Sequence, residues 1–131
     1  MENINTNLLN EMSEIVLKEI YGYGKPDRSD YSEYMLKPAD YFFEKIESSP
    51  ESALPEKILC WSMYEAINIH NGECKLFQGQ QKLEKMILED FSVKDLKIDS
   101  IKQNCVLIDY MHDKTEGILD DKVMHFISYC M

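Results

Sequence analysis

Apolar residues recur at steps of three and four positions along most of this chain, which is the spacing of an amphipathic helix. The clearest case has apolar positions at Ile4, Leu8, Leu9, Met12, Ile15, Val16 and Ile20. Asn5 or Thr6 can cap this helix, because a short side chain with an oxygen atom accepts a hydrogen bond from a free amide of the first turn. The glycines and the proline at positions 22–26 end it. We therefore expect a first helix that ends before Gly22.

The next stretch predicts a loop and two helical segments. We expect the loop over residues 25–30 and a short helix that ends at Leu36. Pro38 has no amide hydrogen to donate, but it fits the first turn of a helix. A second segment is therefore expected from Pro38 to about Ser48, where a Ser-Ser-Pro sequence breaks the chain.

The helix that follows carries apolar residues on more than one side, which predicts a central position in the fold. Pro55 suits its first turn, and Asn71-Gly72 ends it because both residues tolerate the left-handed conformation found at helix C-termini. A further helix is expected over about residues 76–91, although Gly79 weakens it through its low helix propensity.

Residues 104–129 satisfy two patterns. One is a pair of helices, the first capped by Ser100 and the second running from Ile118 to Met131. The other is a β-hairpin, in which the apolar run 105–110 pairs with 123–129 across a loop that contains Gly117. The expected fold is therefore mainly α, a single-domain irregular helical bundle over residues 1–131, with a C-terminal hairpin (α+β) as the alternative.

The composition indicates a folded protein that remains in the cytoplasm. Hydrophobic residues make up 44% of the 131 positions, too many for a disordered acidic chain. No apolar run could span a bilayer, and the N-terminus lacks the basic start of a secretory signal. The four cysteines form no CxxC pair, so we expect them to be small buried apolar residues: Cys60, Cys74, Cys105 and Cys130.

Charge limits the choice of partner. The chain has 24 acidic and 14 basic residues, a net charge of −10, and Arg28 is its only arginine. Such a surface repels nucleic acids and anionic membranes, and it accelerates association with basic proteins. We therefore expect a basic protein partner and neither nucleic acid nor membrane binding.

Candidate catalytic and metal-binding residues are few. His70 and Cys74 are four residues apart, but Asn71-Gly72 interrupts the helix that would align them, and zinc needs more ligands. Asp109, His112 and Asp113 form a small acid–imidazole cluster at helical spacing, yet no recognisable nucleophile accompanies them. We therefore expect no enzyme activity, no cofactor and no metal site.

Tyrosines alternate with acidic residues in one stretch of the chain. Tyrosine suits protein interfaces, because its broad ring packs while its hydroxyl remains hydrated, and neighbouring carboxylates pair with basic groups of a partner. The same residues could instead be core edges and a solvated acidic face. The predicted partner-binding residues are Asp27, Asp30, Tyr31, Glu33, Tyr34 and Asp40.

Two resemblances agree with this interpretation. In size, acidity, single-domain build and lack of an active-site pattern, the whole chain resembles the cytosolic immunity proteins of bacterial contact-dependent inhibition and polymorphic toxin systems. The segment Trp61 to Gly72, followed by Leu76-Phe77, is similar to a pattern in small acidic helical DNA-mimic proteins. Both imply a negative surface that occupies the nucleic-acid site of a basic protein.

The sequence therefore predicts an antitoxin-like inhibitor, a monomer or weak dimer, that blocks a cognate nuclease-type toxin. The alternative is a DNA-mimic regulator that binds a DNA-binding protein. A third interpretation is a small enzyme that uses His70 and Cys74 to bind a metal, or Asp109 and His112 for acid–base chemistry.

Overall fold

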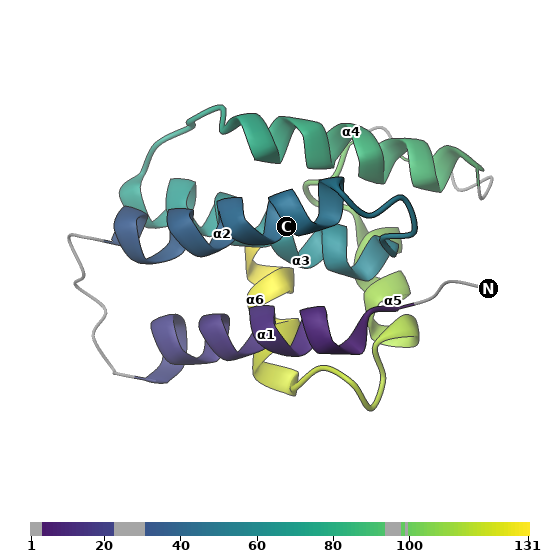
Figure 1. The fold of residues 1–131 in the computed structure, drawn as a ribbon, viewed down its shortest axis with the longest axis horizontal. Helices are drawn as coiled ribbons and strands as arrows, with labels where there is room; N and C mark the ends of the chain where they lie inside the picture. The colour runs from purple at the N-terminus through teal and green to yellow at the C-terminus, as the bar shows by residue number, and fades with distance from the viewer. Residues whose placement is uncertain (1–3, 23–30, 94–97, 99) are drawn as a thin grey trace.

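The structure is a computed structural model that describes residues 4–22, 31–93, 98 and 100–131 (Figure 1). Within these residues the elements are α1 (Thr6–Val16), the π-helical segment η1 (Leu17–Gly22), α2 (Tyr31–Glu47), α3 (Leu54–Asn71), α4 (Gln78–Val93), α5 (Cys105–Lys114) and α6 (Asp121–Cys130). The mainly α prediction is confirmed, and no strand occurs in the described part of the chain. No helix among these residues has the length and apolar character needed to cross a membrane.

Helix α3 is the centre of the fold, as its all-round apolar pattern predicts. It contacts α1, α2, α4 and α6, and every one of its residues from Leu54 to Asn68 except Lys57 is buried. In Figure 1, α4 lies on one side of the α2–α3 pair, and α1 lies on the other with the C-terminal helices. The largest fully buried side chains on α3 are those of Trp61 and Tyr64.

The helix ends follow local sequence signals. Asn5 caps α1, because its side-chain oxygen accepts a hydrogen bond of 3.1 Å from the amide of Leu8. Gly72 caps the C-terminus of α3 in the left-handed conformation, with φ of 65°. Both caps agree with the sequence prediction.

Helix α2 differs from the sequence prediction because it is continuous through Pro38. A proline inside a helix removes one hydrogen bond and costs about 3 kcal/mol. The buried residues of α2 nevertheless recur at steps of three and four on both sides of the proline: Met35, Ala39, Phe42, Phe43 and Ile46. Each large apolar side chain contributes about 1.5–3 kcal/mol on burial, so the packing of this stripe outweighs the lost hydrogen bond.

The C-terminal hairpin alternative for residues 104–129 is wrong, because the two elements in this region are the helices α5 and α6. Asn104 caps α5, in place of the predicted Ser100, by accepting a hydrogen bond of 3.0 Å from Val106. Asp120 caps α6 in the same way, at 2.8 Å from the Lys122 amide. The side chains buried on α6 have helical spacing: Val123, Met124, Phe126, Ile127 and Cys130. A strand would instead have placed His125 and Tyr129, which are exposed, on the same face as Val123 and Ile127.

The expectation that all four cysteines are buried holds for two of them. Cys60 and Cys130 are buried, whereas Cys74 and Cys105 are exposed, and all four are free thiols. Cys74 lies in the segment between α3 and α4, and Cys105 begins α5 with its side chain in solvent. Residue type alone therefore did not decide their burial.

Candidate functional site

Helix α2 carries four of the six predicted partner-binding residues. Tyr31 and Glu33 belong to its first turn, where only the backbone is described. Tyr34 and Asp40 are exposed on the same helix. Asp27 and Asp30 lie outside the described residues.

The exposed surface of α2 divides into two neighbouring stripes, because an α-helix has 3.6 residues per turn. Asp40, Glu44 and Glu47 share one stripe, which we call the acidic stripe. Tyr34 and Tyr41 lie seven residues apart on the adjacent stripe, which also carries Lys37 and Lys45 and which we call the tyrosine stripe. The tyrosines and carboxylates that alternate in the sequence are therefore sorted into separate lines on the helix.

The tyrosine stripe presents large apolar area to solvent. Tyr34 is 44% exposed and Tyr41 is 51% exposed. The Lys45 Nζ atom lies 5.0 Å from the ring centroid of Tyr41, within the range of a cation–π interaction. The Tyr41 ring therefore already holds one cation of the chain itself.

The acidic stripe is joined to the core at one end. The hydroxyl of Tyr64 on α3 donates a hydrogen bond of 2.5 Å to a carboxylate oxygen of Asp40. Burial raises the pKa of Tyr64, and this hydrogen bond together with the charges of Asp40 and Glu44 raises it further. Glu47, at the other end, forms an ion pair of 3.4 Å with Lys82 of α4, with both side chains about half exposed. Asp40 is therefore both a surface carboxylate and a structural contact.

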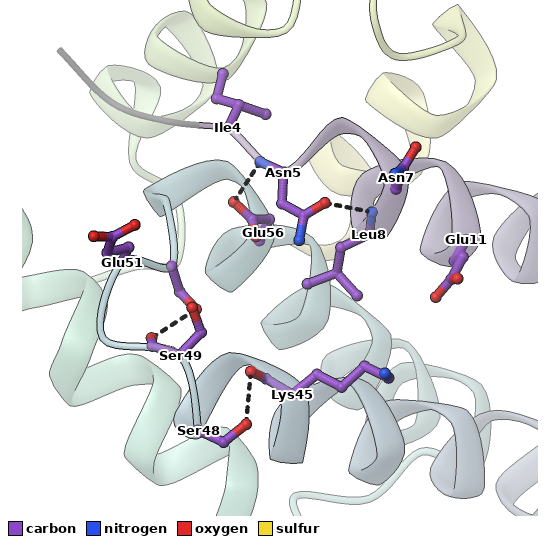
Figure 2. Close-up of a pocket in the computed structure, with 11 residues that line it drawn as sticks. Ile4, Asn5, Asn7, Leu8, Glu11, Lys45, Ser48, Ser49, Glu51 and Glu56 are labelled. Carbon is purple, nitrogen blue, oxygen red and sulfur yellow. Dashed lines mark hydrogen bonds between the residues drawn. The ribbon is translucent and has the colours of Figure 1, made fainter.

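A polar groove adjoins the C-terminal end of α2 (Figure 2). Its volume is about 580 Å³, and it lies between the start of α1, the end of α2 and the turn that leads into α3. Figure 2 shows Glu56 near its centre, with Glu51 on one side and Glu11 on the other. Lys45 also lines the groove, so the groove is continuous with the tyrosine stripe.

Glu56 connects the starts of two helices at this groove. Its Oε2 atom accepts hydrogen bonds from the amide of Asn5 at 3.2 Å and from the amide of Ala53 at 3.1 Å. These residues are the N-caps of α1 and α3. Only 1% of Glu56 is exposed. Burial raises the pKa of its carboxyl, while the two amides and the charge of Lys57 partly offset that increase.

Exposed carboxylates are not confined to α2. The other outer helices also carry them: Glu11 and Glu14 on α1, Glu84 and Glu89 on α4, Asp109 and Asp113 on α5, and Asp121 on α6. The central helix is the exception, because both of its carboxylates, Glu56 and Glu65, are buried. The negative charge therefore surrounds the bundle, and α2 differs in combining it with exposed tyrosines.

The candidate catalytic residues lie at the surface. His70 is exposed in the last turn of α3, and Cys74 is exposed beyond the Gly72 cap. Asp109, His112 and Asp113 are exposed on α5. Among the described residues, no group of three or more His, Cys, Asp or Glu side chains is arranged to hold a metal ion.

Sequence reasoning missed the polar residues of α3 that face the core. Glu65 and Asn68 are buried, and they lie on the same face of the helix as Trp61, one turn earlier. The sequence does contain a signal that could have revealed them, which is a carboxylate within a helix that is apolar on several sides. Burial of such a group requires hydrogen-bonding partners, which a search for active-site motifs does not consider.

The chain was also compared with known proteins. No protein-family model matches it, and neither does any curated protein or solved structure.

Proposed function

We propose that this protein is an immunity-type inhibitor that binds a basic protein through α2. The observation that carries the proposal is the arrangement of this helix, in which the acidic stripe runs beside the exposed Tyr34 and Tyr41 rings. Carboxylates supply charge complementarity and a high association rate, while tyrosines supply contact area at low entropic cost. Together they suit a partner with exposed lysine and arginine side chains.

The proposed mode of binding uses both stripes and the groove. Lysine or arginine side chains of the partner pair with Asp40 and Glu44, and a guanidinium replaces the Lys45 ammonium over the Tyr41 ring. The groove offers a further receptor for a cationic side chain, because Glu11 and Glu51 face it from opposite sides. The inhibitor then covers the basic surface of its partner.

The partner class follows from the same chemistry. A protein that acts on nucleic acid in the cytoplasm needs an exposed cationic surface to hold phosphates. An acidic protein bound to that surface excludes the nucleic acid both sterically and electrostatically. We therefore propose a nuclease-type toxin as the partner.

A second candidate function is a DNA-mimic that binds a DNA-binding regulator. It is favoured by the exposed carboxylates on α1, α4, α5 and α6, which extend the negative surface well beyond α2. The two candidates predict different partners and different interface sizes. A toxin inhibitor depends mainly on α2, whereas a mimic depends on carboxylates from several helices.

The test is co-expression with the product of the gene directly upstream, followed by measurement of growth and of binding affinity. The α2 variant combines Asp40→Asn with Glu44→Gln, in which asparagine retains an oxygen acceptor for Tyr64. A control variant, Glu89→Gln with Asp109→Asn, changes the net charge equally on α4 and α5.

If α2 is the interface, the Asp40→Asn, Glu44→Gln variant should bind the partner at least about tenfold more weakly than wild type at low salt, and it should no longer protect growth. The control variant should retain both properties. Equal weakening in the two variants would favour the DNA-mimic. A binding affinity that neither variant nor the salt concentration changes would eliminate the electrostatic mechanism.

A further inference from the structure

Asp40 is anchored to the core, unlike Glu47 at the other end of the acidic stripe. Its carboxylate accepts the 2.5 Å hydrogen bond from the hydroxyl of Tyr64, a residue with 0% exposure. Glu47 pairs instead with Lys82, and both of these side chains are about half exposed. Asp40 therefore has an orientation set by a buried group, which a solvent-exposed partner does not provide.

The Tyr64 hydroxyl is itself held in place by neighbouring residues. The ring stacks on Phe77 with centroids 5.5 Å apart, and a Cβ atom at Gly79 of α4 would lie 2.9 Å from Tyr64 Cζ. Burial raises the pKa of Tyr64, and the hydrogen bond to Asp40 raises it further, so the hydroxyl remains a donor at neutral pH. Tyr64 therefore fixes the Oδ1 atom of Asp40 wherever the bundle is folded.

The Asp40 carboxylate retains capacity to bind a partner on its outer side. Asp40 is exposed, and the Tyr64 hydroxyl uses one of the roughly four lone-pair sites that a carboxylate offers. A partner that binds here does not have to immobilise the side chain, because Tyr64 has already done so. Immobilising a free side chain otherwise weakens binding, so Asp40 is preorganised for a contact.

A carboxylate with a fixed plane distinguishes arginine from lysine. The guanidinium group is planar, and its paired N–H donors match the two oxygens of a carboxylate that lies in the same plane. An ammonium is a compact point charge with no preferred plane, so it gains little from a fixed carboxylate. The orientation that Tyr64 gives to Asp40 therefore favours a guanidinium group.

We propose that Asp40 selects an arginine side chain of the partner and that Tyr64 is the positioning residue that orients it, an inference that rests on the proposed function and names the chemistry recognised by the acidic stripe. Glu44 and Glu47 attract any basic surface and accelerate association without distinguishing the two cations. Asp40 then supplies the preference for arginine at the point of contact.

The test compares two probes of equal charge, a hexa-arginine peptide and a hexa-lysine peptide, at low salt. The ¹³C resonance of the side-chain carboxyl group at position 40 reports the affinity at this residue. We expect wild type to bind hexa-arginine about tenfold more tightly than hexa-lysine at this group. Equal affinities of wild type for the two peptides would overturn the proposal.

Two variants separate orientation from charge. Tyr64→Phe releases Asp40, so the preference for hexa-arginine should fall below about twofold, whereas a merely structural role of Tyr64 would lower stability and leave the ratio of affinities unchanged. Asp40→Glu keeps the charge but moves the carboxylate by one methylene group away from the position that Tyr64 fixes. It should lose the preference as well, and it decides the question if Tyr64→Phe does not fold.

Glu44→Asp is the matched control, because it also keeps the charge and changes the side chain by one methylene group on the same stripe. It should retain the preference of wild type for hexa-arginine. A preference that survives in a folded Tyr64→Phe protein or in Asp40→Glu, or that disappears in Glu44→Asp, would overturn the proposal.

Binding of the upstream gene product separates this inference from the proposed function. If that protein binds wild type and Asp40→Glu equally but does not bind the Asp40→Asn, Glu44→Gln variant, the proposed function stands and selection by Asp40 is wrong. If it binds none of them while the peptides show arginine selectivity at position 40, Asp40 is an arginine site and the toxin is not its partner.

Discussion

The hydroxyl of Tyr64 donates a 2.5 Å hydrogen bond to Asp40, and this contact ties the acidic stripe of α2 to the core. Tyr64 is fully buried and stacks on Phe77 with ring centroids 5.5 Å apart, whereas Asp40 is exposed. A residue proposed to bind a partner therefore also holds α2 against α3. Any test of the interface must separate these two roles.

Removal of this hydroxyl should destabilise the fold. Tyr64→Phe keeps the ring but loses a hydrogen bond to a charged acceptor, so we expect the free energy of unfolding to fall by about 1–2 kcal/mol. Urea denaturation at pH 7 measures it. Tyr41→Phe on α2 is the control, and it should change stability by less than about 0.5 kcal/mol because that hydroxyl lies on an exposed ring. Equal losses of stability in Tyr64→Phe and Tyr41→Phe would mean that the Tyr64–Asp40 hydrogen bond contributes nothing to stability.

Gly79 should not tolerate alanine, although alanine is the better helix former. A Cβ atom there would lie 2.9 Å from Tyr64 Cζ and 3.2 Å from Phe43 Cδ2. The propensity gain is about 1 kcal/mol, whereas forcing a methyl group into a packed core costs about 1–3 kcal/mol. We expect Gly79→Ala to lower the free energy of unfolding by up to about 2 kcal/mol, measured by urea denaturation. Lys85→Ala, exposed on the same helix, should have almost no effect. A stabilised Gly79→Ala protein would show that the Tyr64 ring moves freely.

Glu56→Gln should remove a pH dependence without removing the link between α1 and α3. The raised pKa means that folding favours the protonated carboxyl, so this group costs stability as the pH rises above 4.5, its ordinary value. Glutamine is always neutral and keeps an oxygen for the amides of Asn5 and Ala53. We expect the free energy of unfolding of the variant to rise relative to that of wild type as the pH is raised from 5 to 7.

Urea denaturation of wild type and of Glu56→Gln at pH 5 and at pH 7 measures this difference. Glu11→Gln is the matched control, because Glu11 lines the same groove but is exposed. It should give the same pH dependence as wild type. A Glu56→Gln protein that loses stability relative to wild type as the pH rises would contradict the direction of the shift.

Cys130 should make the fold sensitive to alkali. Burial raises the pKa of its thiol from 9.0 to about 12, and the charge of Glu65 contributes to the increase. The folded state therefore favours the thiol, so the associated stability is fully present below pH 9 and is lost as the pH rises towards 12. The loss is about 1 kcal/mol per pH unit for a single group.

A comparison of two cysteine variants isolates this effect. Cys130→Ala should flatten the decrease in stability between pH 9 and 11. Cys105→Ala removes an exposed thiol and keeps Cys130, so it should retain the wild-type decrease. Identical pH profiles for Cys130→Ala and wild type would rule out Cys130 as the source.

The helices with clear caps and uninterrupted periodicity could be predicted from the sequence. The cap at Asn5, the apolar stripe of α1 and the left-handed end at Gly72 each depend on residues within a turn or two of one another. Pro38 shows where this reasoning fails. Its local penalty is real, but the packing of α2 on α3 exceeds it, and that packing involves residues distant in the sequence.

The helical class, the central position of α3 and the strongly negative surface can be inferred from the chain alone, because periodicity, capping and charge are properties of nearby residues or of the whole composition. Three other features become visible only in the folded molecule: the helical state of 105–110, the separation of acids and tyrosines into stripes on α2, and the ion pair between Glu65 and Lys102. These features depend on contacts between distant segments. Their energies are set by burial and hydrogen bonding in the folded state, which no local pattern records.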